Sequence, residues 1–399
     1  MKNILLLIFI FVMASFAFAN KSKKTNSDNQ IPIIAWFSIP AEETTLHRYQ
    51  ELKDAGITHS YTPFADIESM QKALDTAQKV GIKMMISCPE LKTETEETVR
   101  LFMNHPAVAG YMLKDEPSRT DFPELGDWVK KIRALDDKHF CYINLYPNHA
   151  YLGRGTKTYE EYVNLFLKEV PVQLLTFDDY PILGDSVRAD WYENLETIAK
   201  ASKDYQKPFW AFALSVAHGF YPLPTMEHLR LQVFSNLAYG AQGIQYFTYW
   251  TPPADTTWNF NNGPISHAGK KTIVYDRVRQ MSNEIIALSS VFLGAKLVSV
   301  VHTGKDIPLG TKRLSNLPAP IETLKTEGLG AVVSTLKKDG KIYLVVVNRD
   351  FKNPMKLNLK ASKKIKQVFK NGKIKSIISE TINIEPGDLA IFSWKENQK

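Results

Sequence analysis

The chain has 399 residues, of which 44% are apolar and 23% are charged, so its composition is that of a globular protein and excludes a disordered or low-complexity one. Lys and Arg number 49 against 42 Asp and Glu, which gives a formal net charge of +7. Two cysteines are too few for a disulfide framework or a cysteine-rich metal site. The length predicts one large domain and one small one.

The first 19 residues have the pattern of a secretory signal peptide. Lys2 is followed by an apolar run from Ile4 to Val12, and Ala17-Phe18-Ala19 is a small-residue cleavage signal. The apolar run is shorter than the roughly 20 residues that a membrane span needs. We therefore expect residues 1–19 to be removed and the protein to be exported, periplasmic or extracellular, with no membrane span. Residues 20–30 are polar and predict a linker.

Residues 31–294 alternate eight times between a short apolar run and a stretch of helical period. The predicted strands are 31–37, 58–62, 83–88, 108–113, 140–145, 174–177, 209–214 and 243–249. The predicted helices are 42–55, 66–80, 93–104, 122–135, 157–169, 188–205, 226–240 and 267–292. Eight such repeats predict an α/β fold, a closed (β/α)8 TIM barrel. No glycine-rich phosphate loop follows the first strand, so we expect no cofactor.

Residues 295–399 have a different texture. Runs that alternate with polar residues at period 2 occur at 329–336, 341–348, 355–359 and 389–394, and Asn371-Gly372 is a hairpin turn signal. They predict a small antiparallel β-sandwich domain packed on the barrel. Residues 325–399 contain 16 basic and seven acidic residues, a balance that would attract an anionic polymer. Aromatic residues are not interleaved with these lysines, which argues against nucleic acid.

Carboxylates follow two of the predicted barrel strands, at the barrel end where active sites lie. The fourth strand continues into Asp115-Glu116-Pro117, and the sixth into Asp178-Asp179. Side chains alternate along a strand, so we expect Asp115 and Glu116 to point in different directions, one to the barrel mouth and the other to a neighbouring loop. Paired carboxylates there suit general acid–base catalysis, although Asp at a strand end also serves in turns.

Aromatic and amide side chains accompany these acids. Rings can stack on the C–H faces of a sugar while acids and amides form hydrogen bonds with its hydroxyl groups, so the pattern predicts a carbohydrate partner. The positive net charge of the chain is compatible with an anionic carbohydrate. No metal-ligand spacing such as H-E-x-x-H is present, so we expect no metal site. The candidate substrate-contacting residues are Trp36, Tyr61, Asp115, Asn144, Tyr146, Tyr180, His218, Gln245, Tyr249 and Trp250.

The motifs Gly110-Tyr111-Met112-Leu113-Lys114-Asp115-Glu116-Pro117 and Phe177-Asp178-Asp179-Tyr180-Pro181 resemble those of barrel glycoside hydrolases with acids at strands four and seven. This is the clan A superfamily, and the resemblance is strongest to exported barrel hydrolases of Bacteroidetes. It implies an enzyme that cleaves O-glycosidic bonds of an oligo- or polysaccharide with two carboxylates. The superfamily motif Asn-Glu-Pro at strand four implies that Glu116 is the general acid.

One departure from the superfamily pattern concerns the second catalytic acid. The superfamily has its nucleophile, a Glu, at the end of strand seven, but residues 209–215 contain no carboxylate. We expect Asp178, or secondly Asp179, to be the ionised partner of a protonated Glu116. Two alternatives stay open: a non-catalytic carbohydrate-binding barrel that lost the strand-seven acid, and a lyase or isomerase acting on acidic sugars.

Overall fold

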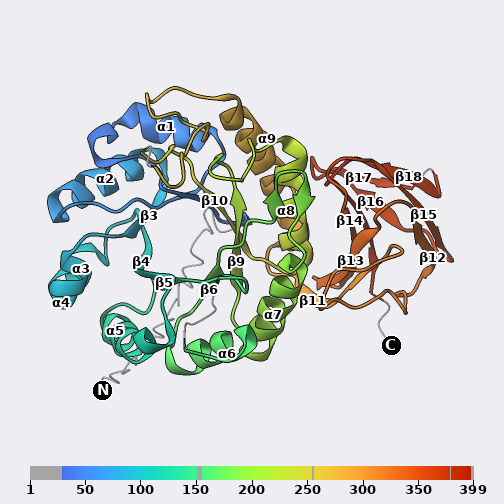
Figure 1. Ribbon diagram of the computed structural model, residues 1–399, viewed down its shortest axis with the longest axis horizontal. Helices are drawn as coiled ribbons and strands as arrows, with labels where there is room; N and C mark the ends of the chain where they lie inside the picture. The colour runs from blue at the N-terminus through green and yellow to red at the C-terminus, as the bar shows by residue number, and fades with distance from the viewer. Residues whose placement is uncertain (1–28, 151–154, 254–255, 378, 397–399) are drawn as a thin grey trace, which may run out of the picture.

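The computed structural model describes residues 29–150, 155–253, 256–377 and 379–396. The predicted signal peptide and most of the predicted linker lie outside the described residues. The described chain forms a closed barrel surrounded by helices, followed by antiparallel sheets that lie beside α8 (Met226–Ala238), as Figure 1 shows. No helix in these ranges is long and apolar enough to cross a membrane.

Eight parallel strands close the barrel, which confirms the predicted architecture. Each barrel strand pairs with the barrel strand that follows it in the chain, and the last pairs with the first. The barrel strands are β1 (Ile33–Trp36), β2 (His59–Ser60), β3 (Lys83–Ile86), β4 (Val108–Asp115), β5 (Phe140–Leu145), β6 (Leu175–Phe177), β9 (Phe209–Leu214) and β10 (Gly243–Phe247). A small hairpin of β7 (Ile182–Leu183) and β8 (Ser186–Val187) follows β6.

The helices surround the barrel and follow the predicted pattern closely. Besides α8, they are α1 (Leu46–Asp54), α2 (Ile67–Val80), α3 (Glu90–Thr93), α4 (Thr95–Phe102), α5 (Phe122–Leu135), α6 (Tyr159–Glu169), α7 (Trp191–Asp204), α9 (Ile273–Ala287) and α10 (Ser289–Phe292), with short 3-10 helices at Ala41–Glu43 and Arg119–Asp121. In α2, the Asp66 carboxylate accepts a hydrogen bond from the Ser69 N–H, and Gly81 at φ +73° ends the helix. The predicted helix 93–104 corresponds to α4, with the short α3 before it, and the predicted helix 267–292 is divided into α9 and α10.

Large side chains fill the barrel interior, so the barrel is a packed core and not a pore. Met85, Met112, Tyr142 and Trp210 belong to this interior cluster. Gly243 makes room for Trp210, because a Cβ at that position would lie 2.6 Å from the indole ring. The filled interior leaves the loops at the carboxyl ends of the strands as the place for a site.

The C-terminal region contains the antiparallel sheets that the sequence predicts. A six-stranded sheet has the order β11-β13-β14-β19-β16-β17, and a three-stranded sheet has the order β12-β15-β18. The strands are β11 (Lys296–His302), β12 (Ile321–Thr326), β13 (Ala331–Lys338), β14 (Lys341–Asn348), β15 (Met355–Ala361), β16 (Lys366–Val368), β17 (Ile374–Ser376), β18 (Thr381–Ile384) and β19 (Leu389–Lys395).

The six-stranded sheet is buried on both faces at its centre. In β14, Tyr343 and Val345 join the core that the sheet shares with the barrel, while Leu344 and Val346 join the core shared with the three-stranded sheet. The predicted alternation with polar residues is therefore wrong for β14. The reason is that α8 covers one face of the strand and the second sheet covers the other, so a continuous apolar run is stable there.

Candidate active site

A cavity of about 290 Å³ lies at the carboxyl end of the barrel. Its walls come from the ends of β1, β4, β5 and β10 and from the loops that follow β5, β6, β9 and β10. The lining residues are Trp36, Asp115, Glu116, Asn144, Pro147, His149, Ala150, Asp178, Asp179, Tyr180, Phe212, His218, Tyr221, Phe247, Trp258 and Phe260. The cavity thus contains every acid that the sequence analysis selected.

A β-bulge near the end of β4 places Asp115 in this cavity. The pairing of β4 with β5 shifts between Met112 and Lys114, which leaves Leu113 as an extra residue. Beyond the bulge the alternation of side chains is reversed, so that Asp115 and not Lys114 comes opposite Asn144. The strand extends two residues beyond its predicted end. Because of the bulge, the carboxylate of Asp115 and not the side chain of Lys114 faces the barrel mouth.

Glu116 lines the same cavity as Asp115, so the prediction that the two side chains point in different directions is wrong. Glu116 has a φ of +47°, in the left-handed region, and its N–H donates to the Asn144 carbonyl at 2.8 Å. This turn of the backbone ends the alternation on which the prediction rested. A left-handed conformation costs a non-glycine residue about 1–2 kcal/mol, and such strain is concentrated at functional sites.

Asn144 at the end of β5 holds two of the acids. Its Nδ2 atom donates to Asp115 Oδ1 at 3.1 Å and to Asp178 Oδ1 at 2.9 Å. Two oxygen atoms that accept hydrogen bonds from the same nitrogen atom at these distances are at most about 6 Å apart. The amide is itself oriented from behind, since Thr176 Oγ1 lies 3.4 Å from Asn144 Oδ1. Asn144 therefore fixes two carboxylates from different strands at a short separation.

Burial and mutual repulsion favour the protonated form of these acids. The pKa of Asp178 is raised well above its usual value, first by burial and then by the negative charges of Glu116 and Asp115, and the hydrogen bond from Asn144 opposes this only in part. The pKa of Asp115 is raised too, because the cavity partly removes water from its carboxylate, although the residue as a whole is exposed. No cation forms an ion pair with Asp115 or Asp178 within the described ranges. The cluster consequently binds a proton more readily than isolated carboxylates do.

Asp179 is the most deeply buried acid of the cavity, with 2% of its surface exposed. Neither of its carboxylate oxygens has a hydrogen-bond partner among the described residues. His149 Nδ1 and Arg188 Nε lie 3.7 Å and 3.9 Å from Asp179 Oδ1, too far for hydrogen bonds. Burial raises the pKa of Asp179 to about 8, against the pull of Arg188, and lowers the pKa of His149 to about 4. Both groups are mostly neutral at pH 7.

Aromatic side chains form the remaining walls of the cavity. Trp36 packs on Tyr61 with ring centroids 4.3 Å apart, and Tyr180 packs on Phe247 at 5.4 Å. His218 lies between Tyr221 and Phe260, and burial lowers its pKa, so it is a neutral member of this wall. At the rim, Trp258 is 44% exposed. Rings on several sides of a group of acids suit a ligand with both apolar faces and hydroxyl groups.

Five of the predicted substrate-contacting residues do not line this cavity. Tyr61 and Gln245 lie deeper in the barrel, where Tyr61 supports Trp36 and Gln245 Oε1 accepts a hydrogen bond from Tyr142 at 2.5 Å. The other three pack against the main core outside the cavity; they are Tyr146, Tyr249 and Trp250. Position at a strand end did not distinguish them from the lining residues, because side chains at a strand end face either the barrel axis or the surrounding helices.

Several residues that line the cavity were not predicted from the sequence. His149, Tyr221, Trp258 and Phe260 all come from loops, at positions that no strand or helix period marks. The one available signal was the length of the segment between β10 and α9, where Trp258 and Phe260 occur in a stretch without helical period. Long loops at this end of a TIM barrel carry functional residues.

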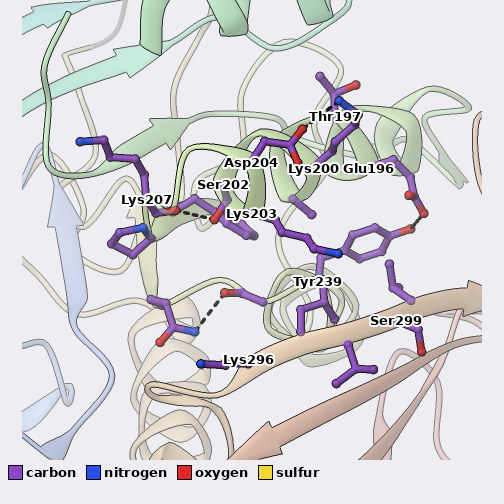
Figure 2. A pocket seen from close by; sticks show the side chains of 18 of the residues that line it. Glu196, Thr197, Lys200, Ser202, Lys203, Asp204, Lys207, Tyr239, Lys296 and Ser299 are labelled. Carbon is purple, nitrogen blue, oxygen red and sulfur yellow. Dashed lines mark hydrogen bonds and ion pairs between the residues drawn. The ribbon is translucent and has the colours of Figure 1, made fainter. Parts of the chain in front are cut away.

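A larger cavity of about 1250 Å³ lies elsewhere, between α7, the residues that precede β9 and β10, and β11. Figure 2 shows its lining, in which Tyr239 points toward Glu196 and donates to its carboxylate at 3.0 Å. This cavity lies at the amino ends of the strands, the face that serves stability in TIM barrels. Among the described residues, no group of three or more His, Cys, Asp or Glu side chains is arranged to hold a metal ion.

Comparisons with known proteins agree with the fold. No protein-family model matches the chain, and no curated protein matches it significantly. Among solved structures, the chain is similar to Gan42B, a GH42 beta-galactosidase, with a TM-score of 0.62, 10% identity, and coverage of 92% of this chain and 98% of that one.

Two further solved structures show the same likeness. A beta-galactosidase from Bacillus circulans matches with a TM-score of 0.59 and 9% identity over 92% of this chain and 99% of that one. An alpha-amylase from Geobacillus thermoleovorans matches with a TM-score of 0.56 and 10% identity over 93% of this chain and 99% of that one. At these identities the likeness shows the fold, which is one that glycoside hydrolases use.

Proposed function

We propose that the protein is an exported glycoside hydrolase that cleaves an O-glycosidic bond of an oligo- or polysaccharide with two carboxylates of the barrel cavity. The observation that carries this proposal is the group formed by Asp115, Glu116 and Asp178, held partly by Asn144 inside a cavity with aromatic walls. Glycoside hydrolysis needs one carboxyl group that is protonated and one that is ionised, on either side of the bond. Neighbouring acids with different environments supply such a pair.

The charges of the cavity support Asp178 as the proton donor. A general acid must keep its proton at working pH, and the raised pKa of Asp178 has this effect. Glu116 is then the ionised partner, acting as nucleophile or as base toward water, and Asp115 bonds hydroxyl groups of the sugar. The sequence alone suggested the opposite assignment, with the proton on Glu116.

The leaving group of the substrate distinguishes the two assignments. We would screen the protein on a panel of neutral and acidic glycosides and then compare alkyl glycosides with dinitrophenyl glycosides, whose leaving group departs without a proton. Asp178→Asn should lose about 10²–10⁴-fold on alkyl glycosides and much less on dinitrophenyl glycosides. Glu116→Gln should lose activity on both, and azide should restore part of it. If Glu116→Gln instead lost activity mainly on alkyl glycosides and Asp178→Asn lost it on both, Glu116 would be the proton donor.

A second candidate function is favoured by the end of β9. This seventh barrel strand leads to Ser215, which is buried and donates through Oγ to the Thr248 carbonyl at 2.8 Å, so no acid occupies that position. The alternative is a barrel that binds carbohydrate without cleaving it. Micromolar glycan binding with no turnover on the whole panel, unchanged in Asp178→Asn, would establish this alternative.

A further inference from the structure

A cavity of about 490 Å³ in the C-terminal region is surrounded by positive charge. It lies at one end of the six-stranded sheet, where β14 and β16 begin and β19 ends. Its lining contains no acidic residue but contains one tryptophan and five lysines, which are Trp394, Lys341, Lys363, Lys364, Lys366 and Lys395. None of the five lysines forms an ion pair within the described part of the chain, whereas Lys337 and Lys370, which do not line the cavity, pair with Glu396 and Asp388.

The sheet register adds an independent observation. Lys341 and Lys395 are directly opposite each other in the pairing of β14 with β19. Like charges in this position are destabilising, so the sheet tolerates a repulsion that a bound anion would relieve. Lys366 pairs with Ser393, two residues before Lys395, and so carries a third positive charge to the same end of the sheet.

Trp394 supplies an apolar surface to the same cavity. Because side chains alternate along β19, it lies on the opposite face of the sheet from Lys341 and Lys395, at the end where the cavity opens. Its side chain is half-buried, packed partly against the core that the two C-terminal sheets share. A rigid indole with one side in a cavity offers a stacking surface at little entropic cost. A volume of this size is within the range of ligand-binding pockets.

We propose that this cavity binds an anionic polysaccharide, with the lysines contacting its sulfate or carboxylate groups and Trp394 contacting a sugar face. The choice of a carbohydrate rests on the proposed function of the barrel; the choice of an anion rests on the lysines alone. A single aromatic residue is a poor match for single-stranded nucleic acid, which binds to successive stacking surfaces.

The test compares dextran sulfate with neutral dextran, two probes with the same sugar backbone, by isothermal titration calorimetry at low and high salt. The wild-type chain should bind dextran sulfate, more weakly at high salt, and should not bind dextran. The combined Lys363→Gln, Lys364→Gln and Lys366→Gln variant should bind dextran sulfate at least about tenfold more weakly. Because these lysines are exposed, the variant should keep its thermal unfolding midpoint.

A matched control removes the same charge from barrel helices, by Lys72→Gln, Lys79→Gln and Lys168→Gln, and should leave binding unchanged. A similar loss in the control would overturn the proposal, because attraction would then be diffuse. Equal or tighter binding of poly(dT) or of phosphatidylserine vesicles would also overturn it. In addition, Trp394→Phe should remove any tryptophan fluorescence change caused by dextran sulfate. Hydrolysis of a small neutral glycoside should be unaffected by the lysine changes, which separates this proposal from that for the barrel.

Discussion

The two ends of the barrel hold their charged side chains in opposite ways. At the amino end, Lys200 pairs with Glu160 and Asp204, and Glu196 accepts a hydrogen bond from Tyr239. At the carboxyl end, acids repel one another around a single amide, and the buried carboxylate of Asp179 has no hydrogen-bond partner among the described residues. The larger cavity is at the amino end, where these charged groups have partners, and the smaller cavity is at the carboxyl end, where the acids repel one another.

This difference indicates where the function lies better than cavity size does. Paired charges at a protein surface are easily stabilised by their partners and by water. Buried acids that repel one another lower stability, and their raised pKa values mark the sites where acid–base chemistry takes place. The amino end can therefore be changed with little effect, whereas changes at the carboxyl end should affect activity before they affect folding.

The largest expected effect comes from removing an acid at the carboxyl end of the barrel, and removing an acid at the amino end is the control. Asp178→Asn should lower kcat/KM on alkyl glycosides by about 10²–10⁴-fold. The thermal unfolding midpoint should not fall, because burial and the neighbouring negative charges disfavour the ionised form of this carboxyl group. Glu196→Gln at the amino end should leave kcat/KM unchanged. Equal losses in both variants would remove the distinction between the two ends.

The second prediction concerns the dependence of activity on pH. With Asp178 as proton donor, the enzyme is active while this group is protonated, and kcat/KM should fall as the pH rises through its raised pKa. Asp178→Asn should lack this fall on dinitrophenyl glycosides. A fall that persists in the variant would assign the titration to another group.

The third prediction concerns the dependence of stability on pH. Because the pKa of Asp179 is about 8 in the folded protein and about 4 in an unfolded chain, the folded form binds more protons between these values. Its contribution to stability is therefore lost as the pH rises from about 4 to 8. Asp179→Asn should reduce this loss by an amount on the order of 1–3 kcal/mol, measured by urea unfolding at pH 5 and pH 8. An identical pH dependence in both proteins would contradict the effect of burying an acid that has no hydrogen bonds among the described residues.

The fourth prediction concerns the rim. Trp258 is 44% exposed, so Trp258→Ala should change folding little but remove a stacking surface for the substrate. We expect KM to rise by about tenfold with kcat nearly constant, which corresponds to about 1.4 kcal/mol of binding. Phe220→Ala is the control, since Phe220 is also exposed but does not line the cavity. Equal effects of the two changes would mean that the cavity does not define the binding surface.

The smallest effect is expected at the amino end. Lys200→Gln removes ion pairs with Glu160 and Asp204 that are open to solvent, so the free energy of unfolding should fall by no more than about 1 kcal/mol. Activity should be unchanged. A loss of activity here would show that the two ends are coupled.

The repeating pattern of apolar residues was enough to predict the barrel. Helical stripes such as that of α2, which Gly81 ends, depend on local backbone preferences that the sequence expresses directly. The same reasoning selected the acids that line the cavity, since parallel strands bring their carboxyl ends to one side. It also identified the antiparallel character of the C-terminal strands, although not that β14 is buried on both faces.

Tertiary structure alone decided how those acids are oriented. Strict alternation would have directed Lys114 to the barrel mouth, but the extra residue Leu113 in the pairing with β5 directs Asp115 there, and the left-handed backbone of Glu116 brings a second carboxylate to the same cavity. Register and backbone handedness depend on the neighbouring strand, and the aromatic rim depends on loops without periodicity. The sequence by itself thus determined that the acids gather at this end. Long-range packing determined how these acids are oriented and which aromatic side chains surround them.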